Sequence, residues 1–122
     1  MEVFLELVPD GGLTPLLHEL QPGGERTLRK TAKSLFTLDL KTGHRNHLLV
    51  CTVTGVGPYA SYIRTLYADW KESRFPRDMR LFLLQGASRS WEFGYCEELQ
   101  AIAADAPWLT YVPTISRFWE DQ

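Results

Sequence analysis

The sequence has few of the residues that build metal centres and disulfide frameworks. It contains two cysteines, Cys51 and Cys96, and three histidines among 122 residues. The cysteines do not have the C-x-x-C spacing of a metal or redox pair, and the histidines have no companion cysteine or carboxylate at a ligand spacing. We therefore expect no metal site, and we expect two reduced thiols, with Cys51 in the core.

Long hydrophobic runs and an excess of one charge are also missing. No apolar run approaches the ~20 residues of a membrane span, and residues 1–6 lack the basic region of a signal peptide. Thirteen Lys and Arg against fifteen Asp and Glu leave no long basic face for nucleic acid. We expect a cytoplasmic protein with neither a membrane nor a nucleic acid as partner.

What is present is enough hydrophobic sequence for one modest core. Of the 122 residues, 44% are hydrophobic, and a chain of this size buries roughly two thirds of its unfolded surface. A two-domain organisation would therefore consist of incomplete domains.

The first forty residues have an antiparallel β character. Residues 1–8 mix alternation with β-formers and end at the turn over residues 9–12. A short helix is expected over residues 13–20, with Thr14 as N-cap and Pro15 in the first turn. Two short strands, 26–31 and 35–40, follow.

The character changes within residues 41–46. Residues 47–53 form a continuous apolar run, typical of a parallel strand buried on both faces. A glycine-rich turn and an apolar stripe over 58–70 predict a following helix. The remaining pattern predicts strands over 79–85 and 108–112 and a helix over 97–105, which is the α/β arrangement of a parallel sheet.

Three of the predicted strand ends carry residues suited to an anionic ligand. They are T-V-T-G-V-G-P at 52–58, Q-G-A-S-R at 85–89 and T-I-S-R at 114–117. Ligands of open α/β sheets bind at this edge, where glycine admits close approach and arginine holds phosphate. Each feature alone also fits a structural turn or a solvated surface charge, but their coincidence at three strand ends favours a nucleotide site.

These motifs resemble those of ferredoxin/flavodoxin–NADP reductases of the bacterial type. Residues 55–59 are similar to the family's T-G-T-G-I-A/G-P-Y/F turn, 84–87 to its H-G/A-V/A-R element, and 114–117 to its V-S-R element. Upstream, residues 4–17 and 20–23 are similar in order and spacing to the last part of its flavin barrel. The resemblance covers nearly the whole chain.

The resemblance implies a mixed fold, α+β followed by α/β. Residues 1–43 would be the C-terminal part of an FAD-binding β-barrel domain. Residues 44–122 would be the N-terminal part of a Rossmann-like NADP-binding domain. Because the family's R-x-Y-S/T flavin motif and its later strands are not found in this sequence, the resemblance is to a truncated or partial member.

The implied function is that of a flavoprotein oxidoreductase using FAD and NADP. Such a protein transfers a hydride between NADP(H) and FAD and electrons to or from ferredoxin or flavodoxin. The flavin would do the redox chemistry, so no side chain is assigned as catalytic. Two alternatives stay open: the reductase component of an oxygenase system, and a non-catalytic nucleotide-binding remnant that self-associates or needs a complementing chain.

The resemblance also implies two sets of cofactor-binding residues. The FAD set is Leu5, Glu6, Leu7, Val8, Leu13, Thr14 and Pro15. The NADP set is Thr54, Gly55, Gly57, Ala87, Ser88, Arg89, Ser116 and Arg117.

Two departures from the family pattern bear on the nucleotide. Val53 stands where the family has the first glycine of its turn, and Ser88 stands where an arginine is common. Arg89 would then have to reach the 2′-phosphate in place of residue 88. The choice between NADP and NAD therefore stays open.

Overall fold

The computed structural model describes residues 2–31, 33, 36–38, 45–76 and 78–120. The chain divides into two compact units, Met1–Thr37 and Leu38–Gln122. The expected boundary within 41–46 falls mostly outside the described residues, and the assignment of the two parts to a flavin and an NADP domain stays a prediction.

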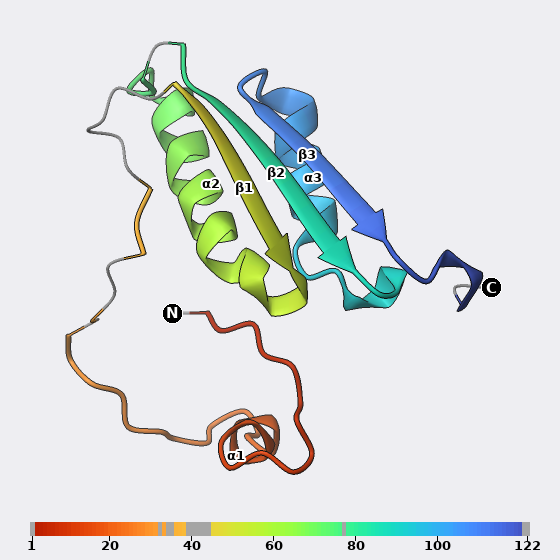
Figure 1. Cartoon of the computed structure of the whole chain (residues 1–122). Helices are drawn as coiled ribbons and strands as arrows, with labels where there is room; N and C mark the ends of the chain where they lie inside the picture. Colours follow the sequence, from red (N-terminus) through yellow and green to blue (C-terminus); the bar gives the residue numbers. More distant parts are fainter. Residues whose placement is uncertain (1, 32, 34–35, 39–44, 77, 121–122) are drawn as a thin grey trace. The chain divides into compact units, whose positions relative to one another are not determined.

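The second unit is a three-stranded parallel sheet in the order β1-β2-β3 (Figure 1). The strands are β1 (Asn46–Thr52), β2 (Arg80–Ala87) and β3 (Leu109–Ile115). Helix α2 (Val56–Lys71) connects β1 to β2, and α3 (Cys96–Asp105) connects β2 to β3. The predicted α/β part is thus confirmed in its elements and in its parallel pairing.

Both helices cover the same face of this sheet. Alternate residues of each strand are buried or half-buried, and the buried ones include Leu49 in β1, Leu81 in β2 and Leu109 in β3. They pack with buried helix residues such as Ile63 and Leu99. Two successive right-handed crossovers in the same direction place both helices on one side, which gives a two-layer unit.

The opposite face of the sheet is open. The intervening residues Leu48, Val50, Phe82 and Val112 are between 41% and 71% exposed. The expectation that residues 47–53 are buried on both faces is therefore wrong for β1. The reason is topological, because neither connection returns a helix to the second face.

The first unit contains one short helix, α1 (Thr14–His18), and none of its described residues is buried. Leu13, not Thr14, occupies the N-cap position, and the Thr14 hydroxyl instead contacts Val8. Residues 2–8 and 26–31 form no strand. A strand is defined by a hydrogen-bonded neighbour, and the described residues of this unit supply none. The expected strand over 35–40 lies mostly outside the described residues.

Candidate functional site

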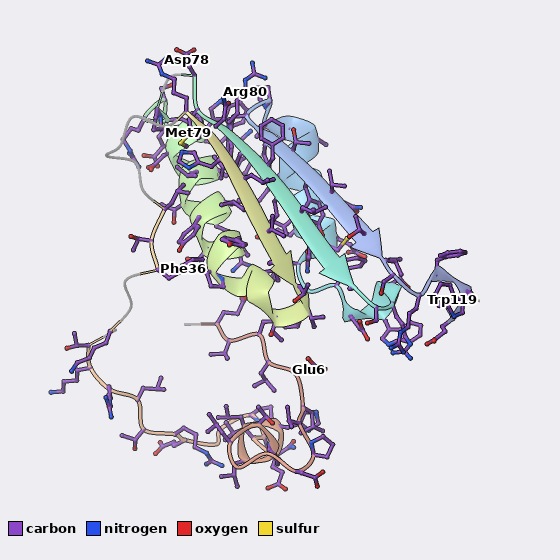
Figure 2. The ribbon with its side chains drawn as sticks, viewed as in Figure 1. Glu6, Phe36, Asp78, Met79, Arg80 and Trp119 are labelled. Carbon is purple, nitrogen blue, oxygen red and sulfur yellow. The ribbon has the colours of Figure 1, made fainter. Side chains whose placement is uncertain are left out.

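A hollow of about 440 Å³ lies where the three strands end. The arrowheads of β1, β2 and β3 meet at this edge (Figure 1). Figure 2 labels residues at the two ends of the sheet. Asp78 and Arg80 lie at the start of β2, whereas Trp119 lies beyond the carboxyl end of β3. The hollow is lined by Thr52, Val53, Gly86, Ala87, Ser88, Thr114, Ile115 and Ser116.

The first side of the hollow is the turn after β1. A 3-10 turn over Val53–Gly55 leads directly into α2. Val53 has a φ of 39°, which is unusual for a β-branched residue. At Gly55, the helix N-cap, no side chain caps the helix, so backbone N–H groups at the helix start can bind an anion.

The floor of the hollow is Gly86 in β2. A Cβ atom at this position would lie 3.5 Å from Cγ2 of Thr52 and 3.7 Å from Oγ1 of Thr114. These are ordinary contact distances, so the backbone would accept alanine, but the added methyl would occupy space between the two flanking strand ends. The glycine therefore keeps the hollow open rather than relieving a clash.

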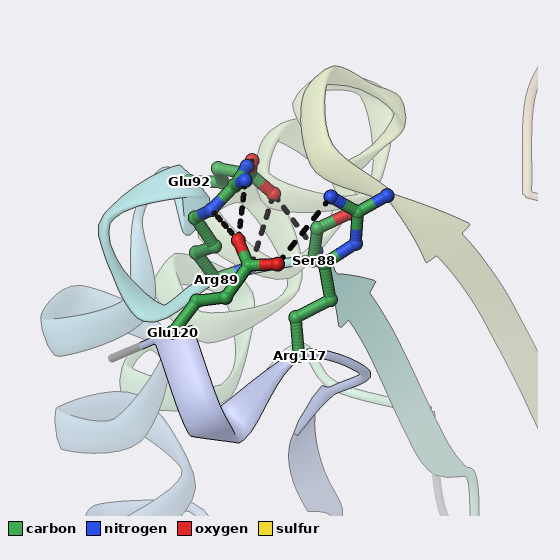
Figure 3. A network of polar contacts seen from close by, with 5 residues as sticks. All are labelled: Ser88, Arg89, Glu92, Arg117 and Glu120. Atoms are coloured by element: carbon green, nitrogen blue, oxygen red, sulfur yellow. Dashed lines mark hydrogen bonds and ion pairs between the residues drawn. The ribbon is translucent and has the colours of Figure 1, made fainter. Parts of the chain in front are cut away.

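A loop that holds the carboxylate of Glu92 follows β2 at Ser88 and Arg89 (Figure 3). The backbone N–H groups of Ser88 and Arg89 donate to Oε2 of Glu92, at 2.8 and 3.2 Å. Nη1 of Arg89 lies 3.4 Å from Oε1 of the same carboxylate. Two N–H groups and a guanidinium that converge on one carboxylate are suited to hold an anion.

These contacts set the titration of Glu92. Desolvation by burial would raise the pKa of its carboxyl group. The hydrogen bonds from the Ser88 and Arg89 N–H groups and the positive charge of Arg89 act in the opposite direction and prevail, so the pKa lies below its ordinary value. The folded loop therefore stabilises the ionised form of the Glu92 carboxylate.

Arg89 and Arg117 meet at a second carboxylate, that of Glu120. Oε2 of Glu120 accepts from Nε of Arg89 at 2.7 Å and lies 2.5 Å from its Nη2. Oε1 lies 3.7 Å from Nη1 of Arg117. The guanidinium of Arg89 also lies over the Trp91 ring, 5.6 Å from its centroid, which is within the ~6 Å reach of a cation–π contact.

We call the edge of the hollow formed by residues 88–92 and 116–120 the rim. Beneath it lies a small buried polar cluster. Gln85 is fully buried, and its Oε1 accepts from the hydroxyl of Tyr111 at 2.7 Å. Burial raises the pKa of Tyr111 and raises that of the Cys51 thiol to about 11. Both cysteines are free thiols, and Cys51 is buried, as predicted. At neutral pH the Tyr111 hydroxyl and the Cys51 thiol are therefore uncharged, and they add no charge to the site.

The structure brings the predicted NADP set together at this edge, although not equally. Ala87, Ser88 and Ser116 line the hollow itself. Thr54 and Gly55 belong to the 3-10 turn after β1, and Gly57 lies in the first turn of α2. Arg89 and Arg117 adjoin lining residues and are paired with carboxylates.

The predicted FAD set lies in the first unit. The Thr14 hydroxyl accepts from the Val8 N–H at 2.9 Å and lies 3.3 Å from the Val8 carbonyl oxygen, which joins the two predicted stretches across the turn. Leu5 and Pro15 are half-buried, Glu6 is exposed, and Leu7, Val8 and Leu13 are between 41% and 64% exposed. This arrangement is a locally ordered turn with free apolar surface.

Sequence reasoning missed the two acidic residues of the rim, Glu92 and Glu120. Glu92 follows Arg89 by three residues, the spacing at which a glutamate side chain reaches back to N-cap N–H groups. That spacing was a usable signal. Glu120 had none, because its contact with Arg89 joins residues 31 positions apart.

The described residues contain no group of three or more His, Cys, Asp and Glu side chains placed to bind a metal ion. In the same part of the chain, no helix has the length and apolar character to cross a membrane.

Comparison with known proteins gives two sequence relatives, both named flavodoxin/ferredoxin–NADP reductase, from Shigella flexneri and Escherichia coli (strain K12). Each is 36% identical over 64 residues, which make up 52% of this chain and 26% of the relative. The match thus spans about a quarter of the relatives' length. No protein-family model matches the chain.

Solved structures with a similar fold include a cytochrome b5 reductase domain and a ferredoxin–NADP⁺ reductase. The cytochrome b5 reductase domain of Ulva prolifera nitrate reductase has a TM-score of 0.51 and 19% identity, over 60% of this chain and 26% of that one. Ferredoxin–NADP⁺ reductase from Plasmodium falciparum with 2′P-AMP has a TM-score of 0.54 and 21% identity, over 70% and 35%. With the sequence relatives, they confirm the resemblance predicted from the motifs: this chain is similar to part of a ferredoxin/flavodoxin–NADP reductase.

Proposed function

We propose that the second unit binds NADP(H) in the hollow at the carboxyl ends of its three strands. One observation carries this proposal: the hollow is lined by Ser88 and Ser116, and each of these serines is followed by an arginine at the rim. Hydroxyl and guanidinium groups are the side chains that hold phosphate esters. The position also matches the rule that open α/β sheets bind ligands beyond their strand ends.

The two sides of the hollow suit the two ends of the nucleotide. Thr54, Gly55 and Gly57, at the start of α2, would contact the nicotinamide and pyrophosphate groups, because glycine permits close approach and the helix start favours anions. Ala87, Ser88, Arg89, Ser116 and Arg117 would contact the adenosine and its 2′-phosphate. A fold relative, the ferredoxin–NADP⁺ reductase from Plasmodium falciparum, was solved with 2′P-AMP, which supports a nucleotide with a 2′-phosphate as the ligand.

We propose that the first unit contributes to an FAD site through residues 5–8 and 13–15. The hydrogen bonds between Thr14 and Val8 fix the turn, and the exposed side chains of Leu7 and Leu13 supply apolar surface for a ring system. When bound, FAD supplies the hydride and electron chemistry. The residues of this chain would bind and orient it.

On this basis the chain is part of a ferredoxin–NADP reductase-like oxidoreductase, with ferredoxin or flavodoxin as electron partner. The oxygenase-reductase alternative differs only in that partner. A non-catalytic nucleotide-binding remnant is the second candidate, and two observations favour it. The first unit has no buried residue among those described, and Val53 lines the hollow at the position where the related motif has glycine.

The proposal is tested by titrating the purified chain with NADP⁺ and following tryptophan fluorescence. Trp91 and Trp119 are 67% and 59% exposed, and the Trp91 ring lies under Arg89, so a ligand at the rim should change their emission. Trp91→Phe identifies which tryptophan reports. Arg117→Ala should weaken binding about tenfold or more by removing a phosphate contact. Arg45→Ala is the control, because Arg45 pairs with Asp78 near the start of β2.

A second arm separates the reductase from the remnant. The chain is incubated with FAD, freed of unbound flavin, and treated anaerobically with NADPH. Flavin absorbance that bleaches with NADPH supports the oxidoreductase, and NADP⁺ binding without flavin supports the remnant. If NADP⁺ does not bind, or if Arg117→Ala and Arg45→Ala affect it equally, the nucleotide site is refuted.

A further inference from the structure

The rim contains an acidic side chain at the place where a phosphate would bind. The carboxylate of Glu120 lies between the guanidinium groups of Arg89 and Arg117 (Figure 3). It uses Nε and Nη2 of Arg89, the pair of donors with which arginine holds a phosphate in bidentate fashion. The protein thus supplies its own anion to the arginine pair.

The contact with Arg89 is partly shielded from solvent. The side chains of Arg89 and Glu120 are 29% and 34% exposed, and Glu92 and the Trp91 ring hold the same guanidinium from other sides. Such a pair is ordered and less screened than a fully exposed one. Arg117 is 51% exposed and lies 3.7 Å from the carboxylate, so it is the less committed arginine.

We propose that Glu120 sets the discrimination between nucleotides with and without a 2′-phosphate, which rests on the nucleotide site proposed above. A phosphate dianion can engage Arg89 only by displacing the Glu120 carboxylate or by lying beside it, and like charges at that distance repel. A ribose with free hydroxyls needs no displacement, and a carboxylate can accept hydrogen bonds from it, as acidic residues do in other dinucleotide sites. Glu120 therefore disfavours NADP⁺ relative to NAD⁺.

The test compares the dissociation constants of NADP⁺ and NAD⁺ for the wild-type chain and for Glu120→Gln. Glutamine keeps the size of the side chain and removes its charge. We expect NADP⁺ to bind about tenfold more tightly to the variant, with NAD⁺ unchanged or weakened. Glu72→Gln is the matched control: it removes the same charge at the end of α2, next to Arg74.

The outcomes separate this inference from the proposed function. If both nucleotides bind and Glu120→Gln leaves their affinity ratio within about twofold of wild type, the nucleotide site stands and the role of Glu120 is refuted. A change that Glu72→Gln reproduces is an effect of net charge and also refutes it. If neither nucleotide binds to any variant while thermal unfolding shows folded protein, the proposed site itself fails, and the inference with it.

Discussion

Val53 combines a β-branched side chain with a left-handed backbone. Its φ of 39° places it in a region that such residues rarely adopt, at a cost of roughly 1–3 kcal/mol. Glycine adopts this conformation freely but loses about 0.5–1 kcal/mol of chain entropy on folding. The first residue of the turn is therefore strained at the edge of the candidate site.

Val53→Gly is expected to raise the free energy of unfolding by about 1 kcal/mol, because the relieved strain exceeds the entropic loss. The same change should tighten NADP⁺ binding by widening the hollow. Urea unfolding and fluorescence titration measure the two effects. Val50→Gly is the control: it lies within β1, where it should only destabilise. Destabilisation by both variants would contradict strain at Val53.

Glu92 gives the rim a pH-dependent contribution to stability. Because its pKa is lowered in the folded state, its contribution is present above the ordinary glutamate pKa of about 4.3 and is lost as the pH falls through the lowered value. Glu92→Gln should therefore be less stable than wild type at pH 7, and the difference should shrink toward pH 3. Unfolding curves at both pH values measure it. A difference that stays constant would mean that ionisation plays no part.

At the scale of elements, the start of α2 is open above Gly57. A Cβ atom at Gly57 would meet nothing within 4 Å, and its φ is not positive. The structure itself thus gives no steric reason for glycine in the first turn of this helix. Space for a ligand would be such a reason.

Gly57→Ala is therefore expected to stabilise the chain by roughly 0.5–1 kcal/mol through helix propensity. If the pyrophosphate lies at this turn, the same change should weaken NADP⁺ binding about threefold or more. Thermal unfolding and fluorescence titration are the measurements. Ala68→Gly near the end of α2 is the converse control, and should destabilise without changing affinity. Unchanged affinity in Gly57→Ala would place the nucleotide away from this turn.

The elements of the second unit could be predicted because their signals are local. Continuous apolar runs, a glycine turn and the stripe of α2 are read within short windows. The burial of β1 on one face only could not be read this way, since it depends on the direction of two crossovers. For the same reason the hollow was predictable as three strand ends, whereas the contact of Glu120 with Arg89 depends on tertiary structure.

In the first unit, the short helix was predictable from Pro15 and the spaced leucines, although its N-cap residue was not. The strands over 1–8 and 26–31 were not correctly predicted, because β-forming residues become a strand only with a partner. The Val8 to Thr14 contact shows the competing interaction: a threonine hydroxyl satisfies the backbone locally.

At the scale of the whole molecule, the open face of the sheet predicts self-association. Leu48, Val50, Phe82 and Val112 present apolar surface, and β1 and β3 each have one unpaired edge within the described sheet. Leu48→Lys should shift the chain toward monomer in light scattering coupled to size exclusion. Ala104→Lys, which adds the same charge at an exposed position of α3, should not. A wild-type chain that stays monomeric at high concentration would contradict the prediction.

The strand order makes β2 the central strand of the sheet, and we expect it to open less often than its neighbours. Within the described sheet it is the strand hydrogen-bonded on both sides, from Arg80 to Gly86 along β1 and from Leu81 to Ala87 along β3. Its amide protons should exchange with solvent most slowly, whereas β1 or β3 can detach singly in a local opening. Each such opening removes one wall of the hollow. A ligand that bridges the ends of β1 and β3 would oppose this detachment. Its binding would be seen first as slower amide proton exchange in these two edge strands.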